Sequence, residues 1–224
     1  MTIDTYGAVD IDAARAWTVT KGSSEVVIYV MDSGIDVRDP DLAGRITSGF
    51  DALNPGSAPV DENSHGTHVS SILGARGENN YGITGVVPGA IQIADGRFLN
   101  SDNQGDSERA LAVVNWMEQD MEERRAQNPN VRFIGSNSWG GSVKSTFLEE
   151  AMQRLSAYDY LPITSAGNHG GNNDEVGYYP CNFALYANTC VAASDRFDLK
   201  ASFSAYGPQT VHLFAPGYQI YGII

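Results

Sequence analysis

The sequence is poor in basic residues and cysteines, and it has no long apolar run. Its 14 Lys and Arg stand against 27 Asp and Glu, a formal net charge of −13. This charge argues against nucleic acid or an anionic membrane as a partner. The simplest explanation of this charge is that it keeps the protein soluble. A mild preference for cationic substrates is the other interpretation. Because no apolar run could cross a bilayer, we expect no membrane span.

The chain has only two cysteines, Cys181 and Cys190. Their even number and short separation favour a disulfide that closes a small loop in an oxidising compartment. Two buried thiols in a reducing cell are the alternative. No signal segment of a basic stretch followed by an apolar one opens the chain at Met1. We nevertheless expect a secreted or surface protein, with its signal outside this chain.

Apolar runs rich in β-branched residues recur along the chain. They predict strands over residues 25–31, 91–99, 131–138, 161–166, 189–193 and 211–215. The first run does not alternate with polar residues, which is typical of a strand buried on both faces of a parallel sheet. The length of the chain fits one domain, which we place over residues 1–224.

Helical patterns lie between these runs. Apolar residues at three-to-four spacing predict a helix over 107–127, for which Asp106 or Ser107 can serve as the N-cap. Thr146 and Glu149 predict a capping box at the start of a second helix. Strands that alternate with helices indicate an α/β fold, with a mostly parallel sheet covered by helices on both faces.

Three polar segments contain residue types that catalyse acyl transfer. Asp32 follows the first strand, at the sheet edge where α/β active sites lie, and His65 stands at a helix start. A serine nucleophile needs a base such as His65, and the base needs an acceptor such as Asp32. Asn168 supplies an amide donor for an oxyanion. Taken singly, each is more simply a turn or capping residue, and His65 with His68 lacks the spacing and third ligand of a zinc site.

Taken together, these segments resemble the subtilisin-like (subtilase) serine endopeptidases over nearly the whole chain. The matching motifs are Asp32–Asp36, Asp39–Leu42, His65–Val69, Gly85–Ala90 and Ala215–Gly217. The triad of that family follows the order Asp, His, Ser. The resemblance implies a subtilisin-like three-layer fold, polypeptide substrates, and hydrolysis of peptide bonds in which Asp32 orients His65, His65 transfers protons and Asn168 stabilises the oxyanion.

The resemblance also implies substrate-binding residues. One set pairs with the substrate backbone as an added strand: Ser138, Trp139 and Gly140. A second set forms one wall of the primary specificity pocket: Ser165, Ala166 and Gly167. Core or turn residues are the alternative for both sets. The preferred substrate side chain cannot be deduced from these residues.

A structural Ca²⁺ is implied as well. Asp41 and Asn79 would bind it through side-chain oxygens, and Gly77, Tyr81 and Ile83 through their carbonyls. Oxygen ligands on a flexible loop suit this hard cation. An ordinary polar loop is the alternative.

The chain departs from the family pattern at two internal places. Ser70-Ser71 replaces a small Ala-Gly pair, and we expect their hydroxyls to bond back to helix carbonyls. Asp95-Gly96 interrupts a run that is smoothly apolar in the family, and it predicts a β-bulge or bend.

The chain also ends at Ile224, before any Gly-Thr-Ser segment of the kind that carries the family's nucleophile. We therefore expect a C-terminally incomplete fold that is inactive as written. The serine is truncated, lies on another chain, or has been lost in a non-catalytic protein that binds peptides or partners. Truncation is favoured because Asp32, His65 and Asn168 all remain. A propeptide or the missing segment would then be a partner. A nucleotide-binding domain is disfavoured, since no Gly-x-Gly-x-x-Gly follows the first strand.

Overall fold

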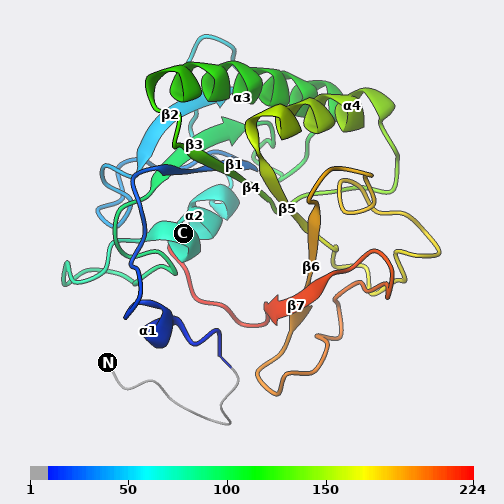
Figure 1. Ribbon diagram of the computed structural model, residues 1–224. Helices are drawn as coiled ribbons and strands as arrows, with labels where there is room; N and C mark the ends of the chain where they lie inside the picture. Colours follow the sequence, from blue (N-terminus) through cyan, green and yellow to red (C-terminus); the bar gives the residue numbers. More distant parts are fainter. Residues whose placement is uncertain (1–9) are drawn as a thin grey trace.

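A seven-stranded, wholly parallel sheet runs through the computed structural model, which describes residues 10–224 (Figure 1). Its strands are β1 (Val26–Asp32), β2 (Ile46–Asp51), β3 (Gln92–Arg97), β4 (Arg132–Asn137), β5 (Leu161–Ser165), β6 (Thr189–Ser194) and β7 (Leu213–Pro216). They lie in the order β2-β3-β1-β4-β5-β6-β7. This confirms the predicted α/β fold. Residues 1–9 of the predicted domain lie outside the described part.

Helices cover both faces of the sheet (Figure 1). Two lie on one face, α3 (Ser107–Gln127) and α4 (Thr146–Arg154), the latter continued by the 3₁₀ turn η1 (Leu155–Tyr158). On the other face lies α2 (His65–Gly74), and the short α1 (Ala13–Ala16) precedes the sheet. Alternate residues of β1 enter two separate apolar clusters, one with α3 and α4 and one with α2. The first strand is therefore buried on both faces, as predicted.

The predicted strands correspond to six of the seven, and β2 was missed. Its sequence Ile-Thr-Ser-Gly-Phe-Asp contains residues that favour turns as well as strands. Because β2 lies at the edge of the sheet, it pairs with β3 alone and alternates between partly buried and exposed residues. An edge strand of this composition gives a weak sequence signal.

The helix α3 has the bounds predicted from the sequence. Its predicted cap is also present, because Asp106 Oδ1 accepts from the Arg109 N–H at 2.8 Å. The capping box predicted for the next helix is wrong. Its N-cap is Ser145, whose Oγ accepts from the Leu148 N–H at 3.3 Å. The predicted partner in the box, Glu149, instead pairs with Lys144.

The bulge predicted at Asp95-Gly96 is also wrong. The register between β1 and β3 is unbroken, and the irregularity lies on β2, between Ile46 and Ser48. Gly96 is small for a different reason: a Cβ at this position would lie 2.6 Å from Val113 Cγ1 on α3. The glycine therefore lets the helix pack closely against the sheet.

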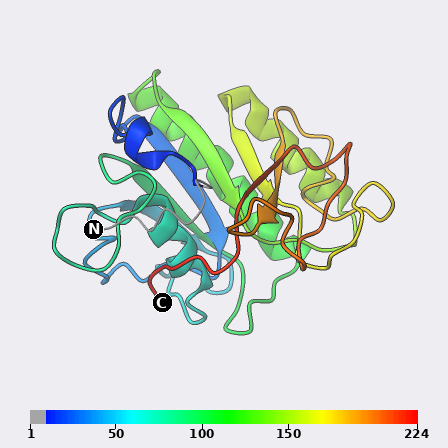
Figure 2. The same ribbon diagram turned by 90° about the horizontal axis from the view of Figure 1, so that it is seen from below.

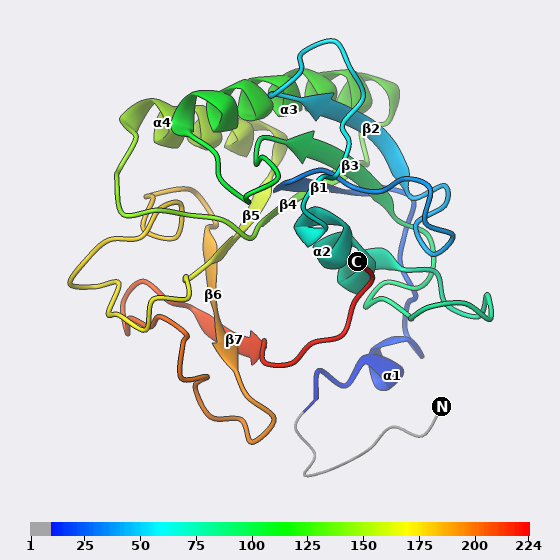
Figure 3. The ribbon, with the colours of Figure 1, turned by 180° about the vertical axis from the view of Figure 1, so that it is seen from behind.

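Two long-range ties complete the fold. Cys181 and Cys190 form the predicted disulfide, with their Cα atoms 5.1 Å apart, and so fix the loop before β6 to that strand. The last described residues run from β7 back to α2, as Figure 2 and Figure 3 show. There the Ile223 N–H donates to Ser71 Oγ at 3.0 Å. Across residues 10–224, no helix combines the length and apolar character that crossing a membrane requires.

Candidate active site

Asp32 and His65 meet at the carboxyl edge of the sheet. Asp32 is the last residue of β1 and fully buried, and His65 is the first residue of α2. The Asp32 Oδ1 and His65 Nδ1 atoms are 2.7 Å apart. The His65 side chain keeps 34% of its surface exposed, whereas that of Asp32 keeps 1%. The carboxylate therefore supports the imidazole from the buried side, and the ring stays partly accessible to solvent.

Two glycines allow this close approach. Gly34 lies in the turn after Asp32 with φ +107°, a conformation that other residues rarely adopt. Any Cβ on Gly66 would overlap the Gly34 carbonyl oxygen. Between them, Ser33 Oγ accepts from the Gly66 N–H at 3.0 Å. The start of α2 is thus held directly against the turn that carries the acid.

A carboxylate that the sequence analysis missed, Asp61, braces the same loop. It accepts from Ser33 Oγ at 2.9 Å, from the Ser64 N–H at 2.9 Å and from Thr67 Oγ1 at 2.6 Å. Burial works to raise the pKa of Asp61, but these and neighbouring hydrogen bonds outweigh it and lower the pKa below its usual value. The sequence did contain a signal for this role, because Asp61 lies three residues before Ser64, a spacing typical of Asx turns and caps.

The environment of His65 suits a proton acceptor that becomes a cation. The hydrogen bond with Asp32 is the largest influence and raises the pKa of His65 above its usual value. Burial opposes the rise, and the charges of Asp32 and Asp61 add to it. A general base works best when its pKa lies near the working pH. The pair therefore favours proton uptake by His65 during a reaction.

The predicted oxyanion and specificity residues lie two strands away along the same edge. Asn168 is exposed just after β5, and it lines a cavity of about 280 Å³ with Ser138, Ser165 and Gly167. Ala166, predicted for the same wall, is not among the lining residues. It points inward and packs in the apolar cluster of the disulfide. Alternation along the strand explains the difference.

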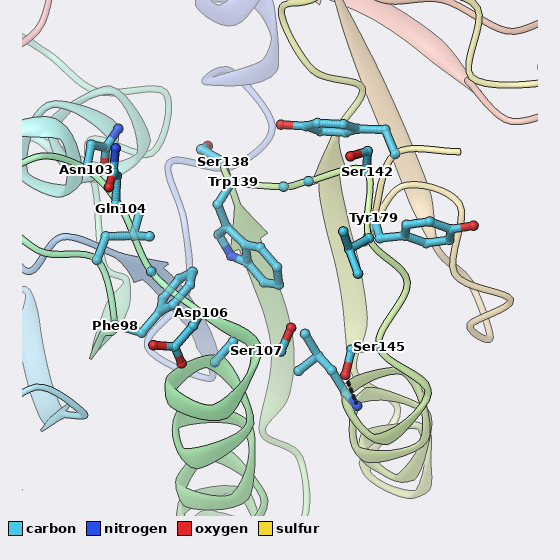
Figure 4. A pocket seen from close by; sticks show the side chains of 18 of the residues that line it. Phe98, Asn103, Gln104, Asp106, Ser107, Ser138, Trp139, Ser142, Ser145 and Tyr179 are labelled. Atoms are coloured by element: carbon cyan, nitrogen blue, oxygen red, sulfur yellow. Dashed lines mark hydrogen bonds between the residues drawn. The ribbon is translucent and has the colours of Figure 1, made fainter. Parts of the chain in front are cut away.

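A larger cavity of about 630 Å³ adjoins Ser138 (Figure 4). Trp139 lines it and meets Phe98 edge to face, with ring centroids 5.0 Å apart. Asn103 and Gln104 face the same space from the loop before α3 (Figure 4). The site thus offers a cavity of mixed polar and apolar lining beside the segment predicted to bind substrate.

The predicted calcium ligands also converge. Asp41 is fully buried, its Oδ1 lies 2.6 Å from Asn79 Nδ2, and its Oδ2 accepts from the Ile83 N–H at 2.8 Å. Among the ion pairs within residues 10–224, none involves Asp41. In the same described part, the carbonyls of Gly77, Tyr81 and Ile83 accept no backbone N–H.

These residues fit a hard cation. Turning the Asn79 amide over would present its oxygen beside the uncompensated carboxylate of Asp41, and the two amide orientations are nearly indistinguishable by shape. One carboxylate with amide and carbonyl oxygens suits Ca²⁺. The described residues contain no group of three or more His, Cys, Asp or Glu that could hold a metal ion.

A buried carboxylate behind a half-exposed imidazole, at the carboxyl edge of a parallel α/β sheet, is the arrangement of a serine hydrolase base. Sequence comparison agrees, since the model of the subtilase family matches residues 23–223. The chain belongs to the subtilase family of serine proteases. It is thus an enzyme by family, and the resemblance stated from its motifs is confirmed.

Three relatives illustrate the match. Thermitase of Thermoactinomyces vulgaris is 36% identical over 217 residues, which are 96% of this chain and 71% of that protein. A thermophilic serine proteinase of Bacillus sp. (strain AK1) is 34% identical over 98% of this chain and 50% of its own length. An extracellular serine proteinase of Thermus sp. (strain Rt41A) is 31% identical over 91% of this chain and 45% of its own. The chain therefore spans about half the length of the latter two relatives.

A solved structure supports the fold independently. The crystal structure of a cold adapted subtilisin-like serine proteinase superposes with a TM-score of 0.71 at 28% identity, over 88% of this chain and 64% of that one. The subtilisin-like fold is therefore shown by structure as well as by sequence.

Proposed function

We propose that this chain contributes the acid and base of a serine endopeptidase that hydrolyses peptide bonds by acyl transfer. One observation carries the proposal: the His65 Nδ1 atom lies 2.7 Å from the buried Asp32 Oδ1. This contact fixes the tautomer of the ring, so that Nε2 is left to accept a proton.

The proposed reaction begins with a serine hydroxyl. Its proton passes to His65 Nε2 while its oxygen bonds to the substrate carbonyl carbon, and Asp32 stabilises the resulting imidazolium. Asn168 donates its amide to the oxyanion. His65 then protonates the leaving amine as the peptide bond breaks, and water releases the acyl group. Within the described residues no hydroxyl hydrogen-bonds to His65, so none of them is assigned as the nucleophile of this proposal.

Substrate would bind as an extended strand along Ser138–Gly140, because Ser138 lines both cavities and Trp139 and Gly140 line the larger one. The apolar floor formed by Trp139 and Phe98 suits an apolar substrate side chain in the larger cavity. Ser165 and Gly167 leave space in the smaller one for the side chain at the cleaved bond.

The experiment uses the product of the full-length gene. We expect it to react with a fluorophosphonate probe at one serine and to cleave casein. A protein that binds peptides but is neither labelled nor active would contradict the proposal and favour the non-catalytic alternative. A single substitution of the labelled serine by alanine is the matched control, since it should abolish both signals and leave peptide binding intact.

We further propose that Ca²⁺ binds at Asp41 and Asn79, with the carbonyls of Gly77, Tyr81 and Ile83. When bound, the ion would supply the positive charge that the buried Asp41 carboxylate lacks among its described neighbours. It would hold the loop of residues 77–83 to the strand-to-helix region behind the site. Its role is structural, and no step of the proposed reaction depends on it.

Removing Ca²⁺ should lower the melting temperature of the full-length protein. A ligand at 100 times its Kd stabilises a fold by about 2.7 kcal/mol, a difference that thermal melts detect readily. The measurement compares melts in excess Ca²⁺ and in EGTA. Asn79→Ala should remove most of this difference, and Asp198→Asn, an exposed carboxylate elsewhere, should preserve it. Equal melting temperatures with and without Ca²⁺ would refute the site.

We propose an extracellular location. It is supported by the Cys181–Cys190 disulfide and by the name of the Thermus relative, an extracellular serine proteinase.

A further inference from the structure

A second buried carboxyl group, that of Asp95, lies beneath the Asp32–His65 pair and takes no part in the proposed reaction. Asp95 is 2% exposed, and its Cα pairs in register with Val30, two residues before Asp32. Its Oδ2 accepts from the Ile35 N–H at 3.0 Å. Ile35 directly follows the turn that carries Asp32, so Asp95 holds the far end of that turn to the neighbouring strand.

The other oxygen of this carboxyl group has no hydrogen-bond partner within the described residues, although it is buried. The same holds for Ser70 Oγ on α2. Ser71 behaves as predicted and donates to the His68 carbonyl at 2.7 Å, whereas Ser70 makes no such bond. A buried polar atom without a partner costs free energy, so two of them near one another call for an explanation.

Packing places these two groups over one another. Gly66 lies against Asp32 at the carboxyl end of β1, and Gly74 lies against Ile93 further back in the sheet. Ser70 is one helical turn from each glycine and is fully buried on the same stripe of α2. Asp95 lies two residues beyond Ile93, and β-strand alternation puts both on the same face of β3. We infer from this packing that Ser70 faces the part of β3 that contains Asp95, although no direct hydrogen bond joins the two side chains.

We propose that Asp95 is a positioning residue of the active site, whose carboxyl group links the turn after Asp32 to Ser70 on the helix that begins with His65. Through this link, the acid and the base keep their mutual distance when substrate binds. The inference rests on the proposed peptidase function for its kinetic consequence, but the link itself is a property of the fold.

Burial of this carboxyl group favours its neutral form. Burial is the largest influence and raises the pKa of Asp95 well above the usual range of a carboxyl group; the hydrogen bond from Ile35 opposes the rise, and the charges of Asp61, Asp32 and Asp51 add to it. Arg97, on the same strand, pairs with Asp51 and Glu62 instead. The titratable groups around Asp95 are Asp32 on β1, Asp51 on β2, Asp61 before α2, His65 on α2 and Arg97 on β3.

A neutral carboxyl group can both accept and donate a hydrogen bond. Its carbonyl oxygen accepts from the Ile35 N–H. Because no direct hydrogen bond joins Asp95 to Ser70, its O–H would reach Ser70 Oγ through one buried water. An ionised carboxylate would instead face Asp32 and Asp61 at close range without a cation of its own. The neutral form thus accounts for both unpartnered atoms.

The test uses the full-length enzyme and four variants: Asp95→Ala, Asp95→Asn, Ser70→Ala and the double variant Asp95→Ala/Ser70→Ala. Asp95→Ala should lower kcat at least tenfold with KM within twofold of wild type, because the turn loses its hold while the substrate cleft is untouched. Asp95→Asn should keep kcat within threefold, since an amide still accepts from Ile35 and donates to Ser70. Once Asp95 has been replaced by alanine, the additional substitution Ser70→Ala should have no further effect on kcat. Asp198→Asn is the matched control and should match wild type.

The pH profile separates positioning from a purely structural role. Asp95→Asn replaces one neutral group by another, so the acid limb of kcat/KM, which follows the pKa of His65, should not move. If Asp95 is ionised in the wild type, removing its negative charge lowers the pKa of His65 and shifts that limb to lower pH. Such a shift, or an unchanged kcat in Asp95→Ala, overturns the inference.

A readout without activity keeps this inference separate from the proposed function. The ¹³C shift of the Asp95 carboxyl carbon, followed by NMR in the full-length protein, should show no ionisation up to neutral pH. Ionisation in the ordinary carboxyl range overturns the inference even in an active enzyme. If the wild type cleaves no peptide, the proposed function fails, and the titration of Asp95 still decides the inference. If Asp95→Ala does not fold, the variants Asp95→Asn and Ser70→Ala still test the inference.

Discussion

Replacing His65 by alanine is expected to lower kcat of the full-length enzyme by about 10⁶-fold, a magnitude taken from triad substitutions in a related serine protease. Among the described residues, the imidazole is the only side chain that hydrogen-bonds to the Asp32 carboxylate, so no neighbour can accept the serine proton in its place. KM should change little, because His65 contributes to the reacting bond rather than to substrate binding. Steady-state kinetics on a chromogenic peptide measures both constants.

The matched control is His169→Ala. His169 is exposed and packs on Tyr178 with ring centroids 5.1 Å apart, away from the Asp32–His65 contact. We expect its kcat to stay within tenfold of wild type. Because the His65 side chain is 34% exposed, its removal should cost little stability. A His65→Ala enzyme with a native melting temperature and a kcat near wild type would refute the proposed role.

Much of the framework could be predicted because its signals are local. The buried central strands are apolar and β-branched, and the 107–127 helix shows regular spacing with a capping Asp106. Asp32 and His65 are 33 residues apart in sequence, yet each was recognisable as ending a strand or beginning a helix. Since parallel strands present their carboxyl ends at one edge, these positions already indicated a shared site.

The features that were missed depend on contacts between distant segments. The polar segment β2 forms a strand because it pairs with β3, not because its residues favour strand structure. Asp61 looked like an ordinary loop residue, and its importance appears only when Ser33 and Thr67 converge on it. The sequence suggested a bulge at Asp95, but the register between β1 and β3 is unbroken there. Its carboxyl group instead accepts a hydrogen bond from the Ile35 N–H, after the turn that follows Asp32.

The substrate side of the site could be predicted only in part. Ser165 and Gly167 line the smaller cavity as expected, but Ala166 between them faces the core. A motif match assigns a segment to a wall, whereas strand alternation decides which of its side chains reach the cavity. The exposed backbone of Ser138–Gly140 follows directly from the end of β4.

Replacing Asp32 by asparagine is expected to lower kcat by about 10⁴-fold, the size known from serine-protease triads. The asparagine amide can donate to Nδ1, which would place the ring proton on Nε2 and block proton uptake from the serine. Folding should survive, because asparagine has the shape of the buried aspartate and the substitution removes only the hydrogen bond from the Ser33 N–H to Oδ1. Asp198→Asn, the same change at an exposed site, should leave kcat unaltered.

The pH dependence of this variant gives the sharper result. Hydrogen bonding to Asp32 is the main reason that the pKa of His65 is raised, and the charge of Asp32 adds to it. Without that carboxylate the pKa of His65 falls, so the neutral base persists to lower pH. The acid limb of kcat/KM should therefore move toward lower pH while the plateau drops. If the plateau drops and the limb stays in place, then Asp32 does not set the protonation of His65, and the electrostatic part of the proposed mechanism is wrong.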